Sequence, residues 1–396
     1  MPDSDVVVLG AARTPIGKYG GSFRDLHPAQ LGAVAARAAI ERAGLTPADI
    51  DEVLIGHGRQ AGSGPNPGRQ VGHRAGIPHS APAQTINKAC ASGLQAIVSG
   101  AQSILLGESN IVLAGGIESM SRMPYLIDSV DARWGHRMGN FTLVDAMYRD
   151  GFQCPLSNLI MGETAEVLAR QYGISRDESD CFALESQRKA KRADYSREIA
   201  PVIVTIKNES TVIDRDEYPR GDTTIESLSK LPPVFGDVEG QTGIITAGTS
   251  SGITDGGAAV VLASAATARA RGLKPRAKIV GWASAGVDPR IMGIGPVPAI
   301  QKLTARTGLK IDDFDLVELN EAFAPQVLAV LKDVPISADR LNVNGGAIAL
   351  GHPIGCTGTR IVVTLLHELE RRNARRGLAT LCVSGGMGMA LAIERI

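Results

Sequence analysis

A cysteine at the start of a predicted helix is the first candidate for chemistry in this sequence. Cys90 lies in TINKACASGLQAIVSG, where Thr85–Ile86 ends a predicted buried strand. Hydrophobic residues recur at helical spacing after the cysteine, at Leu94, Ile97 and Val98. A thiol at this junction lies near the unpaired N–H groups and the positive end of the helix, which favour the reactive thiolate. The simpler alternative is that Cys90 is a small buried hydrophobic residue.

A histidine in a glycine-rich segment is the second candidate. His352 lies between Gly351 and Pro353 within NVNGGAIALGHPIGCTG, residues 342–358. The glycines indicate a tightly folded backbone, and the flanking residues place the imidazole in a stiff turn, which favours a catalytic role over a structural one. A phosphate cradle is the competing interpretation, but neither GxGxxG nor a Gly-Lys-Ser/Thr ending is present.

Two further residues follow predicted strands in the second half of the chain. Cys382 ends a strand in ATLCVSGGMGMA, and pseudo-symmetry with the first half would bring its thiol to the sheet edge that holds Cys90. A second cysteine near the first could instead form a redox disulfide, which the sequence leaves open. Asn320 follows the predicted strand Leu316–Leu319. Capping of the next helix is its default role, although its amide could equally fix a water or polarise an oxygen.

The framework that must position these residues alternates predicted strands with predicted helices. The strands are Val6–Leu9, Glu52–Ile55, Asn110–Ala114, Gly257–Ala263 and Lys278–Ala283, and the helices are Ala29–Ala43, Arg176–Ala193 and Thr359–Arg371. Gly115–Gly116 is predicted to form a tight turn. Such alternation predicts an α/β fold.

The order of elements also repeats. Residues 49–116 and 312–386 each contain a strand, a turn of small residues, a helix, another strand and a glycine pair. This predicts two related α/β halves that face each other. Residues 121–250, which include Arg-containing loops and a polar, proline-containing segment at 214–234, are predicted to form an inserted region.

Composition limits the classes of function. The chain has 396 residues, which suggests two or three domains, and Lys+Arg and Asp+Glu both number 41. This balance, with 4% aromatic residues, argues against nucleic acid or an anionic membrane as a partner. Five widely spaced cysteines without a CxxC pair argue against a disulfide scaffold or a zinc site. The N-terminus resembles no signal or transit peptide, and no apolar run approaches membrane-spanning length, so a cytoplasmic protein without a membrane span is expected.

Several motifs together resemble the thiolase family. INKACASGLQA, NEAFA, NGGAIALGHPIGCTG and the Cys382 segment occur in the order and spacing of that family's four active-site loops. MGETAE, DEYPRGDTTIESLSKL and SGITDGGA extend the resemblance over essentially the whole chain. It implies two pseudo-repeated α/β halves in a layered αβαβα core. The implied domains are an N-terminal half at 1–120 completed by 251–274, an inserted loop domain for coenzyme A at 121–250, and a C-terminal half at 275–396.

The resemblance implies an acetyl-CoA C-acyltransferase with a ping-pong mechanism. Cys90 would hold an acyl group and His352 would take its proton. Cys382 would remove the α-proton of acetyl-CoA in Claisen condensation, or protonate the departing enolate in thiolysis of a 3-ketoacyl-CoA. Two oxyanions need donors: His352 with a water held by Asn320 would serve one, and the backbone N–H groups of Cys90 and Ser384 the other.

Coenzyme A and acetyl-CoA are the implied co-substrates, and the resemblance implies no tightly bound cofactor and no metal. The transferable positions are Arg220, Ser227 and Ser251 for coenzyme A and Met161, Met292 and Phe323 for the acyl pocket. Outside the family context, the first three would be ordinary loop residues and the others core filler. A homodimer or homotetramer that acts in fatty acid metabolism is also implied.

Three residues depart from the family pattern. Ser384 stands where glycine is usual, so a positive φ there would strain the backbone. Thr249 replaces an asparagine, and Ile160 replaces the histidine that contacts pantetheine in short-chain biosynthetic members. The motifs leave the physiological direction open. They also leave two alternatives: a decarboxylating ketoacyl synthase, which would pair the cysteine with two histidines, and a thiolase-like protein that binds acyl-CoA or lipid without turnover.

Overall fold

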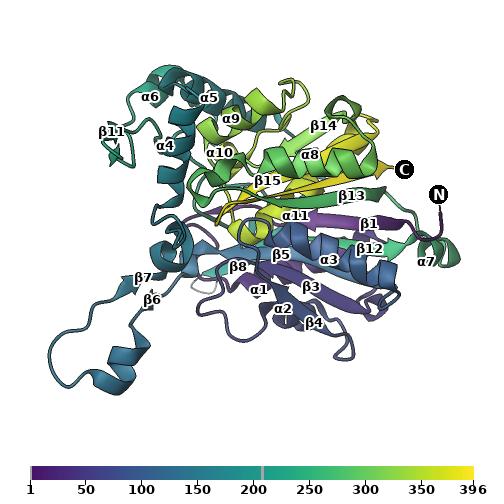
Figure 1. Cartoon of the computed structure of the whole chain (residues 1–396). Helices are drawn as coiled ribbons and strands as arrows, with labels where there is room; N and C mark the ends of the chain where they lie inside the picture. Colours follow the sequence, from purple (N-terminus) through teal and green to yellow (C-terminus); the bar gives the residue numbers. More distant parts are fainter. Residues whose placement is uncertain (1, 207–208) are drawn as a thin grey trace.

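The computed structural model describes residues 2–206 and 209–396 (Figure 1). Within these residues ten strands form one mixed sheet: β1 (Val6–Arg13), β2 (Gly17–Lys18), β3 (Glu52–His57), β4 (Ala83–Ile86), β5 (Ile111–Ser119), β12 (Thr254–Ser264), β13 (Ala277–Gly286), β14 (Leu316–Leu319), β15 (Arg376–Val383) and β16 (Met387–Arg395). The shorter strands pair in twos: β6 (Tyr125–Leu126) with β7 (Val144–Asp145), β8 (Val202–Ile206) with β9 (Glu209–Ile213), and β10 (Asp237–Val238) with β11 (Gln241–Thr242).

The described residues form eleven α-helices. They are α1 (Pro28–Arg42), α2 (Pro67–Ala75), α3 (Ser92–Leu106), α4 (Met161–Gln171), α5 (Arg176–Arg192), α6 (Ile225–Ser229), α7 (Ala265–Ala270), α8 (Pro296–Thr307), α9 (Ala324–Asp333), α10 (Ala347–Leu350) and α11 (Ile354–Arg371). Short 3₁₀ turns occupy Pro47–Asp49, Met120–Arg122, Pro289–Ile294 and Ile311–Asp313, and π-helical turns occupy Asp131–Gly135 and Tyr148–Phe152.

The sheet confirms the predicted repeat. The first half runs β1-β12-β5-β3-β4 and the second runs β13-β16-β15-β14. Each half has two antiparallel pairs, followed by a parallel pair, β5 with β3 in the first and β15 with β14 in the second. A parallel bridge between Val317 and Leu341 takes the place that the β3–β4 pairing has in the first half. β1 and β13 pair antiparallel and join the halves.

Alternating side chains of the sheet build the predicted αβαβα layers. Val6 and Val8 of β1 face the central helices α3 and α11, whereas Val7 and Leu9 face α1, because successive strand residues point to opposite faces. The second half repeats this arrangement, with α11 on its inner face and α8 and α9 on its outer face. The N-termini of α3 and α11 therefore start from the same central layer, which brings the segments before them together.

The residues between β5 and β12 form loops, helices and short paired strands, and most of them lie at one end of the strands of the large sheet, drawn in blue to teal-green in Figure 1. The connection between β6 and β7 projects away from the rest of the molecule (Figure 1). β12 then returns the chain to the first half of the sheet. The domain boundaries at 120, 250 and 274 remain a prediction.

Some local predictions were wrong. Gly115 and Gly116 do not turn the chain but lie within β5. Glycine is needed there because a Cβ on Gly115 would lie 2.6 Å from the carbonyl oxygen of Ala258, and one on Gly116 would lie 2.2 Å from that of Gly355. The strand before Cys90, β4, is a half-buried edge strand. The segment Ala89–Leu106 is long and apolar enough to span a membrane by composition alone, but 61% of it is buried inside the structure as the central helix.

Candidate active site

The Cys90 loop is held in a strained conformation. Ala89 has a φ of 45°, a left-handed conformation that costs a residue other than glycine about 1–3 kcal/mol. The Ser92 hydroxyl donates to the Ala89 carbonyl at 2.6 Å and accepts from the Lys88 N–H at 2.9 Å. The Asn87 side chain accepts from the Ala89 N–H at 3.0 Å. These contacts hold Cys90 in place just before α3.

The Thr357 hydroxyl is the hydrogen-bond partner of His352. Its oxygen lies 3.0 Å from the Pro353 carbonyl oxygen and 2.7 Å from Nδ1 of His352, and both contacts are satisfied when the hydroxyl donates to the carbonyl and Nδ1 carries the ring proton, which is the tautomer we assign. The lone pair of the neutral ring is then on Nε2, which is buried without a partner among the described residues. Gly351, with a φ of 99°, provides the sharp turn before the histidine. An unpartnered Nε2 is free to accept a proton.

Cys382 and Ser384 lie where β15 turns into β16. The positive φ angles of this hairpin fall on Gly385 (86°) and Gly386 (83°), and Ser384 has none. The strain considered for a serine at this position is therefore absent, and its N–H is near enough to the Cys90 thiol to lower the pKa of that group in part. The role predicted for Ser384 needs only that backbone donor.

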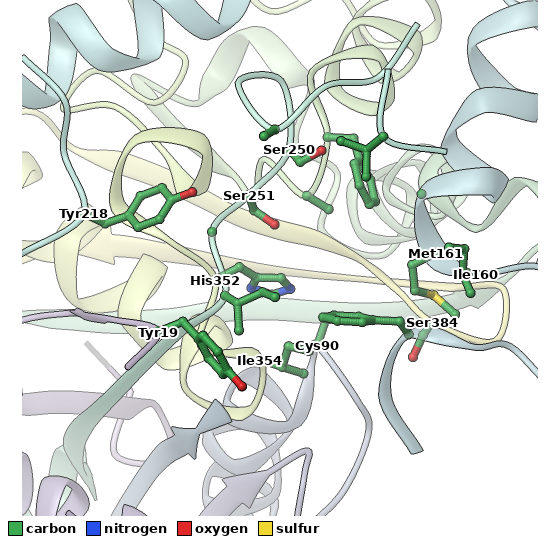
Figure 2. A pocket seen from close by; sticks show the side chains of 18 of the residues that line it. Tyr19, Cys90, Ile160, Met161, Tyr218, Ser250, Ser251, His352, Ile354 and Ser384 are labelled. Carbon is green, nitrogen blue, oxygen red and sulfur yellow. The ribbon is translucent and has the colours of Figure 1, made fainter. Parts of the chain in front are cut away.

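One cavity of about 680 Å³ brings most of the predicted residues together (Figure 2). Cys90, His352, Cys382 and Ser384 line it, and Figure 2 shows Cys90, His352 and Ser384 around the same space. Aromatic residues make up only 4% of the sequence, yet several gather here: Tyr19, Tyr148, Phe152, Tyr218, Phe235 and Phe323. The cavity is thus a mostly apolar space around a small polar centre, as is usual for small-molecule sites.

Burial dominates the electrostatics of the two reacting groups. It raises the pKa of the Cys90 thiol, although Arg59 and the N–H groups of Ser384 and of Cys90 itself lower it in part. The resting group is therefore a thiol, and the thiolate expected from the helix N-terminus alone was wrong. Burial, followed by the charges of Arg360 and Arg59, lowers the pKa of His352 to about 3, so the imidazole is neutral. A neutral base beside a thiol is the arrangement needed for proton transfer during attack.

The thiol of Cys382 is also protonated at rest. Burial and then the neighbouring Cys90 raise its pKa. All five cysteines of the chain are free thiols in this structure. Across residues 2–206 and 209–396, no group of three or more His, Cys, Asp or Glu side chains could hold a metal ion.

Asn320 does not cap a helix, since the N-cap of α9 is Phe323. Its side chain is only 1% exposed, and neither Oδ1 nor Nδ2 has a hydrogen-bond partner among the described residues. A buried amide without partners is costly, and an ordered water can satisfy it. This supports the second of the two roles considered, that of holding a water.

The residues predicted for the acyl pocket and for coenzyme A differ in placement. Met161, Met292 and Phe323 pack with Cys382 in one hydrophobic cluster at the cavity wall. Arg220 and Ser251 line the cavity, and the Arg220 guanidinium lies 5.5 Å from the centre of the Tyr218 ring. Ser227 does not line it; its hydroxyl donates to the Thr224 carbonyl at 2.7 Å within the exposed start of α6.

The two other departures from the family pattern have separate consequences. Ile160 lines the cavity at the N-terminus of α4, so the wall is apolar where a histidine was the alternative. Thr249 is fully buried, and its hydroxyl accepts from the Thr246 N–H at 2.8 Å. Its carbonyl accepts from the Ala324 N–H at 2.8 Å, which joins the 246–251 loop to α9. Thr249 therefore supports the loop of Ser251.

Sequence reasoning missed two charged residues: Arg59, which lines the cavity, and Glu118, which accepts from the backbone of Arg59. Oε2 of Glu118 accepts from the N–H groups of Gly58, Arg59 and Gly355, at 3.2, 3.2 and 2.9 Å. Oε1 lies 3.0 Å from Nε2 of His57. Glu118 thereby ties the end of β3 to the first turn of α11. A carboxylate within an otherwise apolar strand was the available signal, because buried charges need partners.

Comparisons with known proteins agree with this geometry. The chain matches "Thiolase, N-terminal domain" over residues 6–266 and "Thiolase, C-terminal domain" over residues 273–395. It is 48% identical to the acetyl-CoA acetyltransferase of Cupriavidus necator, with 99% of this chain and 100% of the relative covered. Its fold is similar to that of the Bacillus anthracis acetyl-CoA acetyltransferase, with a TM-score of 0.95, 43% identity and 99% of both chains covered. It is also similar to human mitochondrial 3-ketoacyl-CoA thiolase in complex with CoA, with a TM-score of 0.94, 42% identity, and 99% and 98% of the two chains covered.

Proposed function

The chain belongs to the thiolase family, and on that premise we propose that it is an acetyl-CoA C-acyltransferase with a ping-pong mechanism through an acyl group on Cys90. One observation carries the proposal: Cys90, His352 and Cys382 line one cavity, and Nε2 of His352 is unpartnered among the described residues. A binding protein would have no need for two thiols, an imidazole and a buried amide at one site.

In thiolysis the resting protonation states define the first half-reaction. The Cys90 thiol gives its proton to Nε2 of His352 while its sulfur attacks the 3-keto carbonyl of the substrate. The N–H groups of Cys90 and Ser384 stabilise the oxyanion that forms. The carbon–carbon bond then breaks, and the Cys382 thiol protonates the departing carbon to give acetyl-CoA. The acyl group remains on Cys90 as a thioester.

The enolate oxygen of the departing acetyl-CoA needs its own donors. The proton that His352 now holds at Nε2, together with a water on Asn320, supplies them. In the second half-reaction coenzyme A gives its thiol proton to Cys382 and attacks the acyl carbonyl, the bond to Cys90 breaks, and His352 returns the proton to Cys90. Claisen condensation is the same sequence in reverse.

We assign the coenzyme A contacts to Arg220 and Ser251, because both line the cavity and a planar guanidinium suits a phosphate or an adenine. Contact of Ser227 with the cofactor remains a prediction. Met161, Met292 and Phe323 would surround the acyl chain beside Cys382.

We further propose a homodimer or homotetramer in the cytoplasm that acts in fatty acid metabolism. An edge strand such as β4 offers unpaired N–H and C=O groups to a second copy, which supports self-association. Light scattering of the full chain would measure its mass in solution.

The activity is tested by coenzyme A-dependent cleavage of acetoacetyl-CoA, followed as loss of its absorbance. We expect cleavage, and 3-ketoacyl-CoA substrates of graded length would then measure the chain-length preference. No cleavage of any of them, with release of carbon dioxide from malonyl-CoA instead, would show a ketoacyl synthase.

A further inference from the structure

A buried arginine lies beside the nucleophile without a carboxylate partner. Arg59 is 7% exposed and lines the cavity with Cys90. Its Nη1 donates to the carbonyl of Asp150 at 2.8 Å, and its Nη2 to that of Gly151 at 2.6 Å. Within the described part of the chain its guanidinium makes no ion pair, and its Nε has no partner. Because its contacts are neutral, the positive charge of the Arg59 guanidinium is not cancelled, and in a buried site its electrostatic field is weakly screened.

The charged and titratable groups around Cys90 do not cancel this field. The effect of Arg59 is the largest of those that lower the pKa of Cys90, and Glu118 acts in the opposite direction. The Glu118 carboxylate is, however, engaged by His57 and by backbone N–H groups. Of the other titratable groups that line the cavity, His352 and Cys382 are neutral at rest, and Lys18, Glu217, Arg220 and the tyrosines are not among the groups that shift the pKa of Cys90. Arg59 is therefore the nearby group that favours negative charge on Cys90.

The same side chain holds part of the cavity wall. Arg59 binds the Tyr148–Phe152 turn, whose Tyr148 and Phe152 line the cavity. Gly151 fits against the guanidinium because a Cβ there would lie 3.0 Å from Nε. The turn comes from the inserted segment, whereas Arg59 follows β3 of the core. One residue thus joins the two regions at the wall of the cavity that Cys90 lines.

We propose that Arg59 is a positioning residue for acyl transfer: its buried, carbonyl-bound guanidinium stabilises negative charge on the Cys90 sulfur and seats the Tyr148–Phe152 turn over the site. The inference rests on the proposed role of Cys90 as the nucleophile. Arg59 need not touch the substrate, since it acts through Cys90 and through the turn.

The test is the pH dependence of Cys90 alkylation by iodoacetamide, quantified by mass spectrometry of the peptide that contains residue 90. This readout needs no acyl-CoA, so it can fail or succeed independently of the proposed activity. In Arg59→Met we expect the midpoint to rise by about one pH unit, and alkylation below the midpoint to slow by about tenfold. Arg59→Lys, which keeps the charge, should restore most of the rate.

Two further variants separate charge from structure. Arg59→Gln keeps one amide donor for the turn but removes the charge, and it should shift the midpoint as Arg59→Met does, even if the latter folds poorly. Arg69→Met is the matched control, since Arg69 also donates to two backbone carbonyls, of Ala81 and His79, but away from the cavity. It should leave the midpoint unchanged. Equal midpoints in wild type and Arg59→Gln, or an equal shift in Arg69→Met, would overturn the proposal.

Discussion

The two halves of the sheet make the same connection in different ways. In the second half Ser384, Gly385 and Gly386 alone join β15 to β16, whereas in the first half residues 120–253 separate β5 from β12. The short hairpin holds a backbone donor and Cys382 rigidly next to Cys90. The long connection supplies the walls of the cavity, including the turn that Arg59 holds. A repeated core thus carries the proposed catalytic residues, and one lengthened connection supplies much of the wall of the cavity around them.

The central helices α3 and α11 begin in the same way but follow different reactive side chains. Cys90 precedes α3 and His352 precedes α11, and a positive φ comes just before each, at Ala89 and at Gly351. Equivalent positions in the repeat therefore carry the proposed nucleophile in one half and its proposed base in the other. The comparison predicts that the two residues are not interchangeable and that the inserted segment contributes to binding more than to chemistry.

The largest effect is expected from the first half. Cys90→Ala removes the atom that holds the acyl group, so turnover of acetoacetyl-CoA should fall by about 10⁴-fold or more. The steady-state rate measures this, with circular dichroism to show that the variant is folded. Persistent turnover would mean that the second half catalyses the reaction without a nucleophile from the first.

Removal of Cys382 should separate the two half-reactions. Cys382→Ala keeps Cys90 and His352, so exchange of acetyl groups between acetyl-CoA and labelled coenzyme A should slow less than carbon–carbon cleavage, because the thiol of coenzyme A is acidic enough to lose its proton to solvent. Carbon–carbon bond formation and cleavage should slow by about 10²–10⁴-fold, because the proton donor to carbon is lost. Equal losses in exchange and in cleavage would contradict the proposed proton transfer between Cys382 and carbon.

Lowering the pH should affect stability through His352, before α11, but not through Cys90, before α3. Cys90 stays a thiol between pH 7 and pH 5, whereas burial lowers the pKa of His352 to about 3. Because the pKa of His352 in the folded state lies below the unfolded value of 6.5, the unfolded chain binds a proton at this residue before the folded chain does. The stability present above pH 6.5 is therefore lost as the pH falls from 6.5 toward 3. Between pH 7 and 5 the wild type should lose about 2 kcal/mol more unfolding free energy than His352→Gln. Urea titrations at both pH values measure this, and equal losses would place the histidine in a different state.

The smallest effects are expected in the binding walls. Ser251→Ala should raise KM for coenzyme A about fivefold with little change in kcat, because one neutral hydrogen bond is lost. Ser227→Ala should change KM less than about twofold, because that hydroxyl is bound within α6. A larger effect at Ser227 would show that α6 closes on the substrate.

The core was predictable because burial and repetition leave strong patterns. The apolar periodicity after Cys90 located the N-terminus of α3, and the repeat indicated that it meets the segment of His352. The start of the second helix was predicted too late, at Thr359, because the glycines were assigned to a turn, whereas α11 begins at Ile354. Gly115 and Gly116 were misread because glycine also permits close backbone approach, and only the positions of Ala258 and Gly355 in the folded chain show that this is its role here. The repeated order of strands, turns and helices in the two halves can be recognised from local sequence patterns alone.

The electrostatics were less predictable. A helix N-terminus favours thiolate at Cys90, but burial outweighs it, and burial depends on side chains distant in sequence. The placement of Ser227 outside the cavity and of Arg59 beside it likewise depends on how the inserted segment folds onto the core. The roles of Arg220, Ser251 and the acyl-pocket residues remain predictions for the same reason.

Direct observation of the acyl-enzyme tests the central claim. The full chain is mixed with acetyl-CoA, quenched with acid, digested and mapped by mass spectrometry. The account predicts an acetyl group on the peptide that contains Cys90, at up to one per chain, with none on the peptide that contains Cys382. Turnover without any acetylated peptide, or an acetyl group on Cys382 instead, would contradict it.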